Sequence, residues 1–316
     1  PPRFAGSERA FGLLKGQELL LAPEVRGTEP MAFQWRRDGM VLEGENGPTL
    51  ARAAVTGTDA GVYELVASNR VGVTSSPAQT VSIVHVAAWG SNTMGPTQVP
   101  HSATNLVAVA AGVNHSLGLR EDGTVLGWGD STFGQTMPPD AATNVVAIAA
   151  GDGVSLVLRA DGGLIAWGSN DHGQMTTPAD ATNLIGIAAG PAHCLAVRQD
   201  GKVFAWGANW AGECTVPESA TNVVAVAAGG GHSLALRADG TAVAWGSGSY
   251  GMNSVPEAAT NVVAIAAGGE HNLALRADGT VVGWGSNDAG ESAPPEWATN
   301  LVSISAHGCS SLGVCA

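Results

Sequence analysis

Residues Asn261 to Gly285 read NVVAIAAGGEHNLALRADGTVVGWG, and this stretch decides the fold because close copies of it recur along the chain. The apolar run Val262 to Ala267 and the alternating segment His271 to Arg276 are typical of β-strands. Asp278-Gly279 follows them and predicts a two-residue type I′ hairpin turn, with a third strand at Thr280 to Trp284. A Gly-, Ser-, Asn- and Pro-rich segment ends the unit and predicts a loop with room for a short edge strand.

The unit repeats with a constant period. Trp-Gly and Ala-Thr-Asn each occur six times from residue 89 onward, and successive copies within each series are 39 residues apart. The tryptophans are Trp89, Trp128, Trp167, Trp206, Trp245 and Trp284, and the tripeptides begin at Ala103, Ala142, Ala181, Ala220, Ala259 and Ala298. Three or four short antiparallel strands per repeat, with no helical periodicity, predict the blades of a β-propeller.

The arithmetic of the repeat predicts six blades. Residues 83–316 number 234, which is six times 39. Five complete units lie between the first and last Ala-Thr-Asn copies, with half a unit at each end. Residues 83–102 carry the Trp89 strand and its loop, and residues 298–316 carry the two strands that precede them in other copies. We therefore expect the two halves to pair as a composite blade, which removes the free sheet edges.

The pattern GxxHSLALRADGTVVAWG…GQ resembles the repeats of the regulator of chromosome condensation superfamily of β-propellers. The short period and the phrases VVAWG and ATNVVAIAAG are similar to the bacterial branch that includes the second β-lactamase inhibitory protein. The resemblance covers residues 83–316 and implies a propeller with pseudo-symmetry about a central axis. It also allows a second function, that of a proteinaceous enzyme inhibitor.

Residues 1–82 lack the repeat and form a separate predicted domain. Asp59-x-Gly61-x-Tyr63 resembles the tyrosine corner of immunoglobulin-like sandwiches, and Trp35 fits their buried core tryptophan. Leu65 stands where antibody domains have their second cysteine, so we expect packing alone to hold the sandwich. We predict an all-β chain with an immunoglobulin-like sandwich over residues 1–82, resembling bacterial domains of this kind, and a propeller over residues 83–316.

Charge and composition exclude several functions. The chain of 316 residues has 14 basic and 27 acidic residues, a net charge of −13. Residues 1–82 contribute eight basic and nine acidic residues, so the propeller keeps six and 18, a net charge of −12. This balance disfavours nucleic acid and anionic membrane surfaces as partners. No run of 18 or more apolar residues predicts membrane insertion. The chain begins at Pro1 without a leader, which favours a processed product or a piece of a longer protein.

No pattern predicts catalysis, a cofactor or a metal site. The four cysteines do not form a CxxC motif, and we expect free thiols, with pairing of Cys194 and Cys214 as the less favoured alternative. Four copies carry histidine at one position, and the geometry of a ring favours a packed imidazole bonded to a backbone carbonyl over metal ligation. These histidines are His115, His193, His232 and His271. The aspartates of the Asp-Gly pairs are expected to serve the turns, and the arginines before them to pair with nearby carboxylates.

The positions that vary while the scaffold repeats are the candidate binding residues. A glycine always follows six residues after each tryptophan of the Trp-Gly pairs, and the residues just before it are often large. We expect these loops to share one face of the disc, where large side chains are typical anchors of protein interfaces. The candidates are Met94, Phe133, His172, Trp210 and Tyr250. The alternative, which stays open here, is that each side chain covers the edge of its own blade.

The sequence thus favours a non-catalytic, extracellular or cell-surface protein-binding or assembly module, part of a larger bacterial surface or secreted protein. Its partners would be another protein or neighbouring subunits of an assembly, with a glycan as an alternative. A proteinaceous inhibitor of a hydrolase, binding through the propeller face, is the second hypothesis. An enzyme acting on polysaccharide is the third, and it would need two carboxylates facing each other across a cleft.

Overall fold

The computed structural model describes residues 1–84, 86–90 and 92–315. The chain divides into two compact units, Pro1–Ser91 with Thr97–Leu106, and Asn92–Pro96 with Val107–Ala316. Strands dominate both units, and the described helical segments are the 3-10 turns η1 (Gly57–Asp59) and η2 (Ser249–Gly251). Among the described residues, no helix has the length and apolar character needed to cross a bilayer.

The first unit is a sandwich of short strands. They are β1 (Arg3–Phe4), β2 (Arg9–Leu14), β3 (Leu19–Leu21), β4 (Val25–Arg26), β5 (Ala32–Arg37), β6 (Met40–Val41), β7 (Leu50–Arg52), β8 (Gly61–Asn69), β9 (Gly72–Ser75) and β10 (Gln79–Val84). One sheet has the order β2-β10-β8-β5-β6, with β9 also on β8, and β3-β7 and β1-β4 form two further ladders. β10 runs parallel to β2 and antiparallel to β8, and it ends two residues beyond the predicted boundary at residue 82.

The core of this unit confirms the immunoglobulin-like expectation. Trp35, Tyr63 and Leu65 are fully buried, together with Leu21 and Leu50 from the β3-β7 ladder. The Tyr63 hydroxyl donates to the carbonyl of Asp59 at 2.8 Å, which is the predicted tyrosine corner. Leu65 fills the core where a disulfide would cross it, so apolar contacts join the layers at this point.

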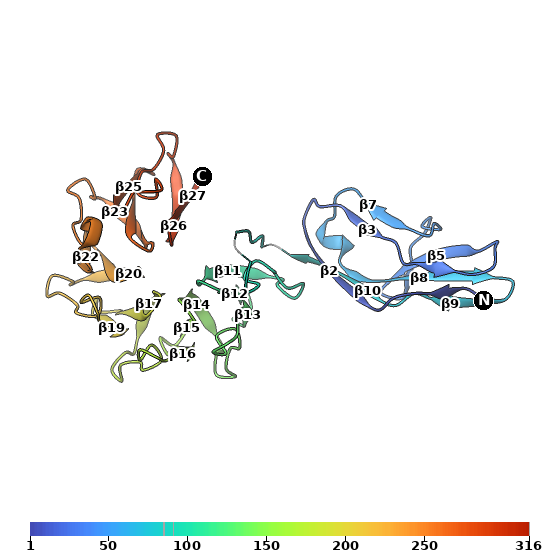
Figure 1. The fold of residues 1–316 in the computed structure, drawn as a ribbon, viewed down its shortest axis with the longest axis horizontal. Coiled ribbons are helices and arrows are strands. Elements are labelled where there is room, and N and C mark those ends of the chain that lie inside the picture. Colours follow the sequence, from blue (N-terminus) through green and yellow to red (C-terminus); the bar gives the residue numbers. More distant parts are fainter. Residues whose placement is uncertain (85, 91, 316) are drawn as a thin grey trace. The chain divides into compact units, whose positions relative to one another are not determined.

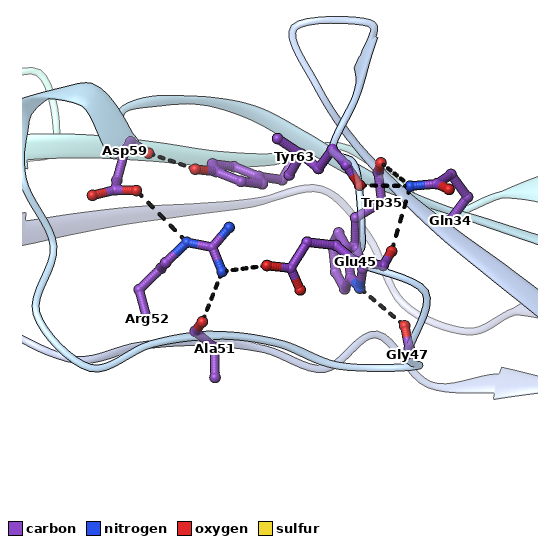
Figure 2. A network of polar contacts seen from close by, with 9 residues as sticks. Gln34, Trp35, Glu45, Gly47, Ala51, Arg52, Asp59 and Tyr63 are labelled. Atoms are coloured by element: carbon purple, nitrogen blue, oxygen red, sulfur yellow. Dashed lines mark hydrogen bonds and ion pairs between the residues drawn. The ribbon is translucent and has the colours of Figure 1, made fainter.

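Polar contacts fasten the loops around that core (Figure 2). The Trp35 indole donates to the Gly47 carbonyl at 3.1 Å, and the Arg52 guanidinium lies 2.8 Å from a Glu45 carboxylate oxygen. A second Arg52 nitrogen lies 3.7 Å from Asp59, whose pKa is lowered mainly by the hydrogen bond from the Thr56 backbone. The contacts of Arg52 thus tie β7 to the two loops that flank it.

The second unit consists of five three-stranded sheets and one two-stranded sheet, which follow one another around an arc (Figure 1). The first strands are β11 (Leu106–Ala111), β14 (Val145–Ala150), β17 (Leu184–Ala189), β20 (Val223–Ala228), β23 (Val262–Ala267) and β26 (Leu301–His307). The second are β12 (His115–Arg120), β15 (Val154–Arg159), β18 (His193–Arg198), β21 (His232–Arg237), β24 (His271–Arg276) and β27 (Ser310–Cys315). The third are β13 (Val125–Gly129), β16 (Leu164–Gly168), β19 (Val203–Gly207), β22 (Ala242–Gly246) and β25 (Val281–Gly285). The optional fourth edge strand is absent from the described residues, so each complete repeat has three strands.

Apolar clusters lie between consecutive sheets. One of them joins Leu195 and Val197 of β18 to Val223 and Ala235 of the next sheet, and Trp245 of that sheet closes it. The second strand of each sheet points its side chains alternately to the two faces of the sheet. Each sheet therefore contributes to the apolar cluster before it and to the one after it. Stability is therefore a sum of such interfaces, as in other repeat proteins.

The Asp-Gly hairpin differs from the predicted type I′ turn. Gly123 has φ of +77°, but Asp122 does not have a positive φ, as a type I′ turn would require. The Gly123 amide donates to the Arg120 carbonyl at 3.0 Å, and the Arg120 amide donates to the Thr124 carbonyl at 2.9 Å, which makes a three-residue loop with glycine in the left-handed position. A carboxylate oxygen of Asp122 accepts the Thr124 amide at 2.9 Å, and this bond favours the observed turn.

The backbone conformation explains why the Ala-Thr-Asn motif ends in asparagine. Each asparagine has φ between +52° and +56°, the left-handed region that asparagine tolerates better than other non-glycine residues: Asn105, Asn144, Asn183, Asn222, Asn261 and Asn300. The Asn222 carbonyl accepts the Ala238 amide at 2.9 Å, just after β21. The motif therefore sets the entry into each first strand and fixes it against the following hairpin.

The structure does not confirm the predicted composite blade. Residues 86–90 contain no strand, and β26 and β27 make a sheet of two. The residues before them form β10, which pairs with β2 and β8 in the first unit. Trp89 is 76% exposed, whereas the other five Trp-Gly tryptophans are buried. Residues 85 and 91, within the predicted closing segment, lie outside the described residues.

Candidate functional site

The strand connections divide the second unit into two ends. We call the loop face the end that carries the turns between first and second strands and the first part of each loop after a third strand. The later part of each such loop returns to the opposite end, where the Ser219 carbonyl accepts from Arg237 at 3.0 Å. The two kinds of segment are hydrogen-bonded: the Ser169 amide donates to the Gly153 carbonyl at 2.8 Å, and Ala208 donates to Ala192 at 2.9 Å. We call the opposite end, with the turns between second and third strands, the hairpin face. As predicted, the variable loops of the five complete repeats share one face.

A buried Gln or Glu holds the loop of each of four repeats. The Gln135 side-chain oxygen accepts the Phe133 amide at 2.9 Å, and Gln174 does the same for His172. In two later repeats, carboxylates of Glu213 and Glu291 accept the corresponding amides at 2.7 Å. This role was not predicted from the sequence, although Gly-Gln in the repeated pattern was a signal for it.

The backbone carbonyls of the same positions join consecutive repeats. Each accepts the indole N–H of the next Trp-Gly tryptophan at 2.7 to 3.0 Å, and the acceptors are Pro96, Gln135, Gln174, Glu213 and Met252. The Ser155 and Ser233 hydroxyls donate to two of these carbonyls at 2.8 Å. The loop that displays a variable side chain is thus fixed both by its own repeat and by the next one.

The four histidines continue this network between repeats. Each Nε2 atom lies 2.7 to 3.0 Å from a side-chain oxygen 40 residues along the chain, on Ser155, Ser233, Asn272 or Ser311. The prediction of a backbone-carbonyl partner was therefore wrong, because the neighbouring repeat offers a hydroxyl or an amide first. The Ser155 hydroxyl donates to a carbonyl and must accept from His115, so Nε2 of His115 carries the proton. Burial lowers the pKa of His115 and of His193 to about 4, and both are neutral near pH 7.

The candidate binding side chains are large and exposed. Phe133, Trp210 and Tyr250 are 51%, 72% and 59% exposed, and Met94 in the segment 92–96 is 54% exposed. A Cβ atom placed on Gly153 would lie 3.2 Å from the Phe133 ring, so this ring rests on the turn of the next repeat.

His172 and Trp210 come from consecutive repeats and contact each other. Their ring centroids are 4.7 Å apart at an interplanar angle of 78°, an edge-to-face arrangement. Tyr250 occupies φ of +53° in η2, a conformation that bulky side chains rarely adopt. Met252 replaces the Gln or Glu of other repeats at this loop, so the amide of Tyr250 lacks the bond that holds Phe133 and His172. The structure brings His172 and Trp210 together, whereas Phe133 and Tyr250 lie on separate repeats.

The remaining reactive groups among the described residues form no disulfide and no metal site. All four cysteines are free thiols, and burial raises the pKa of Cys194 beyond its ordinary range and that of Cys214 to about 11. Within the described ranges, no three His, Cys, Asp or Glu side chains are grouped closely enough to hold a metal ion. Arg159 and Arg198 pair with Asp161 and Asp200 at 3.0 and 2.7 Å, as predicted for the arginines before the turns.

Part of this chain is similar to solved structures of immunoglobulin-domain proteins. The I-band fragment I67–I69 from titin is 26% identical, covers 26% of this chain and 32% of that chain, and has a TM-score of 0.24. Titin M4 is 24% identical, with 26% and 95% coverage and a TM-score of 0.24. The N-terminal Ig1–2 module of the Drosophila receptor protein tyrosine phosphatase DLAR is 20% identical, with 26% and 45% coverage and a TM-score of 0.23. No curated protein matches the chain.

A family model matches the second unit. The regulator of chromosome condensation (RCC1) repeat matches five segments, residues 106–135, 145–174, 185–211, 223–251 and 262–291. Each segment begins at or next to a first strand, and the first four end in loops that carry a candidate binding residue. Five repeats are matched where the sequence arithmetic predicted six. Residues 106–291 therefore carry five repeats of the regulator of chromosome condensation (RCC1) type.

Proposed function

We propose that this protein is a non-catalytic protein-binding module that contacts its partner through the loop face of the second unit. The observation that carries the proposal is the exposure of Phe133, Trp210 and Tyr250 at equivalent loops of a chain in which aromatic residues make up only 5%. Exposed aromatic side chains on well-fixed loops lose little conformational entropy on binding, and such residues dominate the energetics of interfaces.

The setting of this function is part of the proposal. An immunoglobulin-like domain beside RCC1-type repeats favours an extracellular or cell-surface role within a larger bacterial surface or secreted protein. The partner would then be a neighbouring subunit or a second secreted protein.

Affinity capture from the native source, followed by mass spectrometry, tests the binding face. The triple variant Phe133→Ala, Trp210→Ala, Tyr250→Ala is expected to lose at least about tenfold in recovery of the partner that the wild type captures, because interface aromatic side chains each contribute on the order of 2 kcal/mol. Trp297→Ala is the matched control, since Trp297 is 78% exposed but belongs to the hairpin-face connection.

Thermal unfolding of the same variants separates binding from packing. We expect the triple variant to unfold within a few degrees of the wild type, because its side chains are mostly solvated. Equal capture by the triple variant would contradict the proposal. A large shared fall in melting temperature would assign these side chains to packing between repeats instead.

A closing third strand for the last sheet is a further part of the proposal. A groove of about 480 Å³ runs along β27 and is lined by apolar residues that include Leu273, Leu301 and Leu312. The Glu291 carbonyl accepts the Ser311 hydroxyl at 2.6 Å, but in the described residues no indole donates to it, unlike its five counterparts. Trp89-Gly90 is the copy of the Trp-Gly motif that has no sheet, and we assign it to this position.

The closing strand has a direct test in Trp89→Ala. If Trp89 completes the last sheet in solution, its truncation is expected to cost about 3 kcal/mol, as for other buried large side chains, and to lower the melting temperature. Trp210→Ala removes an equally large exposed side chain and is expected to change little. Equal melting temperatures for the two variants would show that Trp89 closes no sheet.

A further inference from the structure

The second unit separates its charges between its two faces. Its Lys and Arg side chains all lie toward the hairpin face, at the ends of second strands or at the start of β19. They are Arg120, Arg159, Arg198, Lys202, Arg237 and Arg276. Over the described residues 107–315, the loop face carries no Lys or Arg.

Some carboxylates of the hairpin face have a basic partner, whereas those of the loop face have none among the described residues. On the hairpin face, Asp180 lies 2.7 Å from Lys202, and Asp161 and Asp200 pair with arginines. On the loop face, four exposed carboxylates form no ion pair within the described part of the chain: Asp152, Asp171, Glu270 and Asp288. The loop face therefore presents negative charge without a basic side chain of its own to neutralise it.

Two of these carboxylates belong to residues that are adjacent in sequence to the residues carrying or supporting exposed rings. Asp171 is next in sequence to His172, whose ring contacts Trp210 at a centroid distance of 4.7 Å. Asp152 precedes Gly153, the turn residue against which Phe133 rests. A ring face with a carboxylate next to it suits a planar cation, because the guanidinium can stack on the ring and hydrogen-bond the carboxylate at the same time.

We propose that the loop face binds a cationic polypeptide surface that presents arginine side chains. This inference rests on the proposed function and specifies the charge and the side chains of the partner. Each arginine would stack on an exposed ring and pair with the neighbouring carboxylate. Attraction between opposite charges across such a face speeds association and suppresses acidic partners, among them nucleic acids and anionic polysaccharides.

The test compares two variants of equal net charge. The loop-face variant removes four charges by Asp152→Asn, Asp171→Asn, Glu270→Gln and Asp288→Asn. The hairpin-face control removes four exposed carboxylates from one repeated position by Asp140→Asn, Glu218→Gln, Glu257→Gln and Glu296→Gln. Each variant changes the net charge from −13 to −9, so the two lose equal charge from different faces.

The probe is an alternating Arg-Gly decapeptide titrated into the full chain by calorimetry at about 0.1 M salt. We expect the loop-face variant to bind it about tenfold more weakly than the wild type, since each exposed charge pair contributes a factor of roughly 1.5 to 5. The hairpin-face control is expected to change by less than about twofold, because charges on the far face are screened beyond about 10 Å at 0.1 M salt. Alternating Lys-Gly peptide is expected to bind more weakly than Arg-Gly, since an ammonium group stacks poorly.

Three results would overturn the inference. An equal loss of affinity in the two variants would mean that net charge alone attracts the peptide. No measurable binding of the Arg-Gly peptide would exclude a cationic polypeptide as the partner. Tighter binding of a Glu-Gly peptide than of the Arg-Gly peptide would show that the loop face prefers acidic partners. Failure here is distinguishable from failure of the proposed function: if the Phe133, Trp210 and Tyr250 truncations abolish capture of the native partner, the binding face stands although its partner is not cationic.

Discussion

At the scale of single residues, backbone conformation explains two features that recur through the chain. The asparagine of every Ala-Thr-Asn copy and the glycine of every Asp-Gly pair occupy positive φ. The sequence indicated the glycine through the known preferences of turns, but the asparagine was only a marker of the period. Its role required the observed φ, because Thr-Asn before an apolar run has no unique conformation.

Asn222 gives a prediction at this scale. Asn222→Ala is expected to lower the free energy of unfolding by about 1 kcal/mol, because alanine in the left-handed region meets a steric cost that asparagine tolerates better. Asn222→Gly is the matched control and is expected to stay within about 0.5 kcal/mol of the wild type, since glycine adopts φ of +52° without that cost. Denaturant unfolding measures both, and equal losses in the two variants would contradict the backbone explanation.

At the scale of the repeat, side chains of one sheet complete the hydrogen bonding of the next. A histidine bonds a hydroxyl or amide 40 residues later, and a loop carbonyl accepts an indole 32 residues later. The strands Val262–Ala267 and His271–Arg276 were predicted with their observed bounds, because apolar runs and alternation report strands directly. The partners of the histidines could not be predicted, since they depend on how consecutive sheets approach each other.

The buried histidines predict a loss of stability in acid. His115 and His193 have a folded pKa of about 4 against an ordinary value of 6.5, so the unfolded chain binds more protons between these values. The free energy of unfolding is therefore expected to fall as the pH drops from about 6.5 to 4, by up to about 3 kcal/mol for each histidine. Unfolding curves across this range measure the slope.

Two variants test whether a buried histidine causes this dependence of the free energy of unfolding on pH. His193→Gln keeps a donor toward Ser233 but cannot take up a proton, so its stability should depend less on pH between 6.5 and 4. His101→Gln, at an exposed histidine, is the control and should keep the slope of the wild type. If both variants retain the full slope, the buried histidine is not its source.

At the scale of the whole molecule, the sequence predicted the two kinds of domain but not the state of the last sheet. The pattern around Trp35 and Tyr63 predicted the sandwich core, and the period of 39 residues predicted the repeated sheets. The composite blade was inferred from the repeat arithmetic and from the half units at the two ends. The structure does not confirm it, because residues 86–90 contain no strand and the last sheet has two strands.

The binding face was predicted as a set of variable loop positions, and the structure adds what those positions share. Phe133 and His172 each contact the following repeat, and both loops are held by a buried glutamine. The separation of charge between the two faces could not be read from the net charge of −13. It follows from the strand order, which places every second-strand arginine at the end opposite the loops.

The most direct test of the account is hydrogen–deuterium exchange on the full chain with and without the captured partner. If the loop face is the binding surface, protection on binding is expected in residues 130–135, 169–174 and 208–213, with the hairpin turns at residues 121–123 and 199–201 unchanged. Protection of those hairpin turns with none in the loops would contradict the central claim.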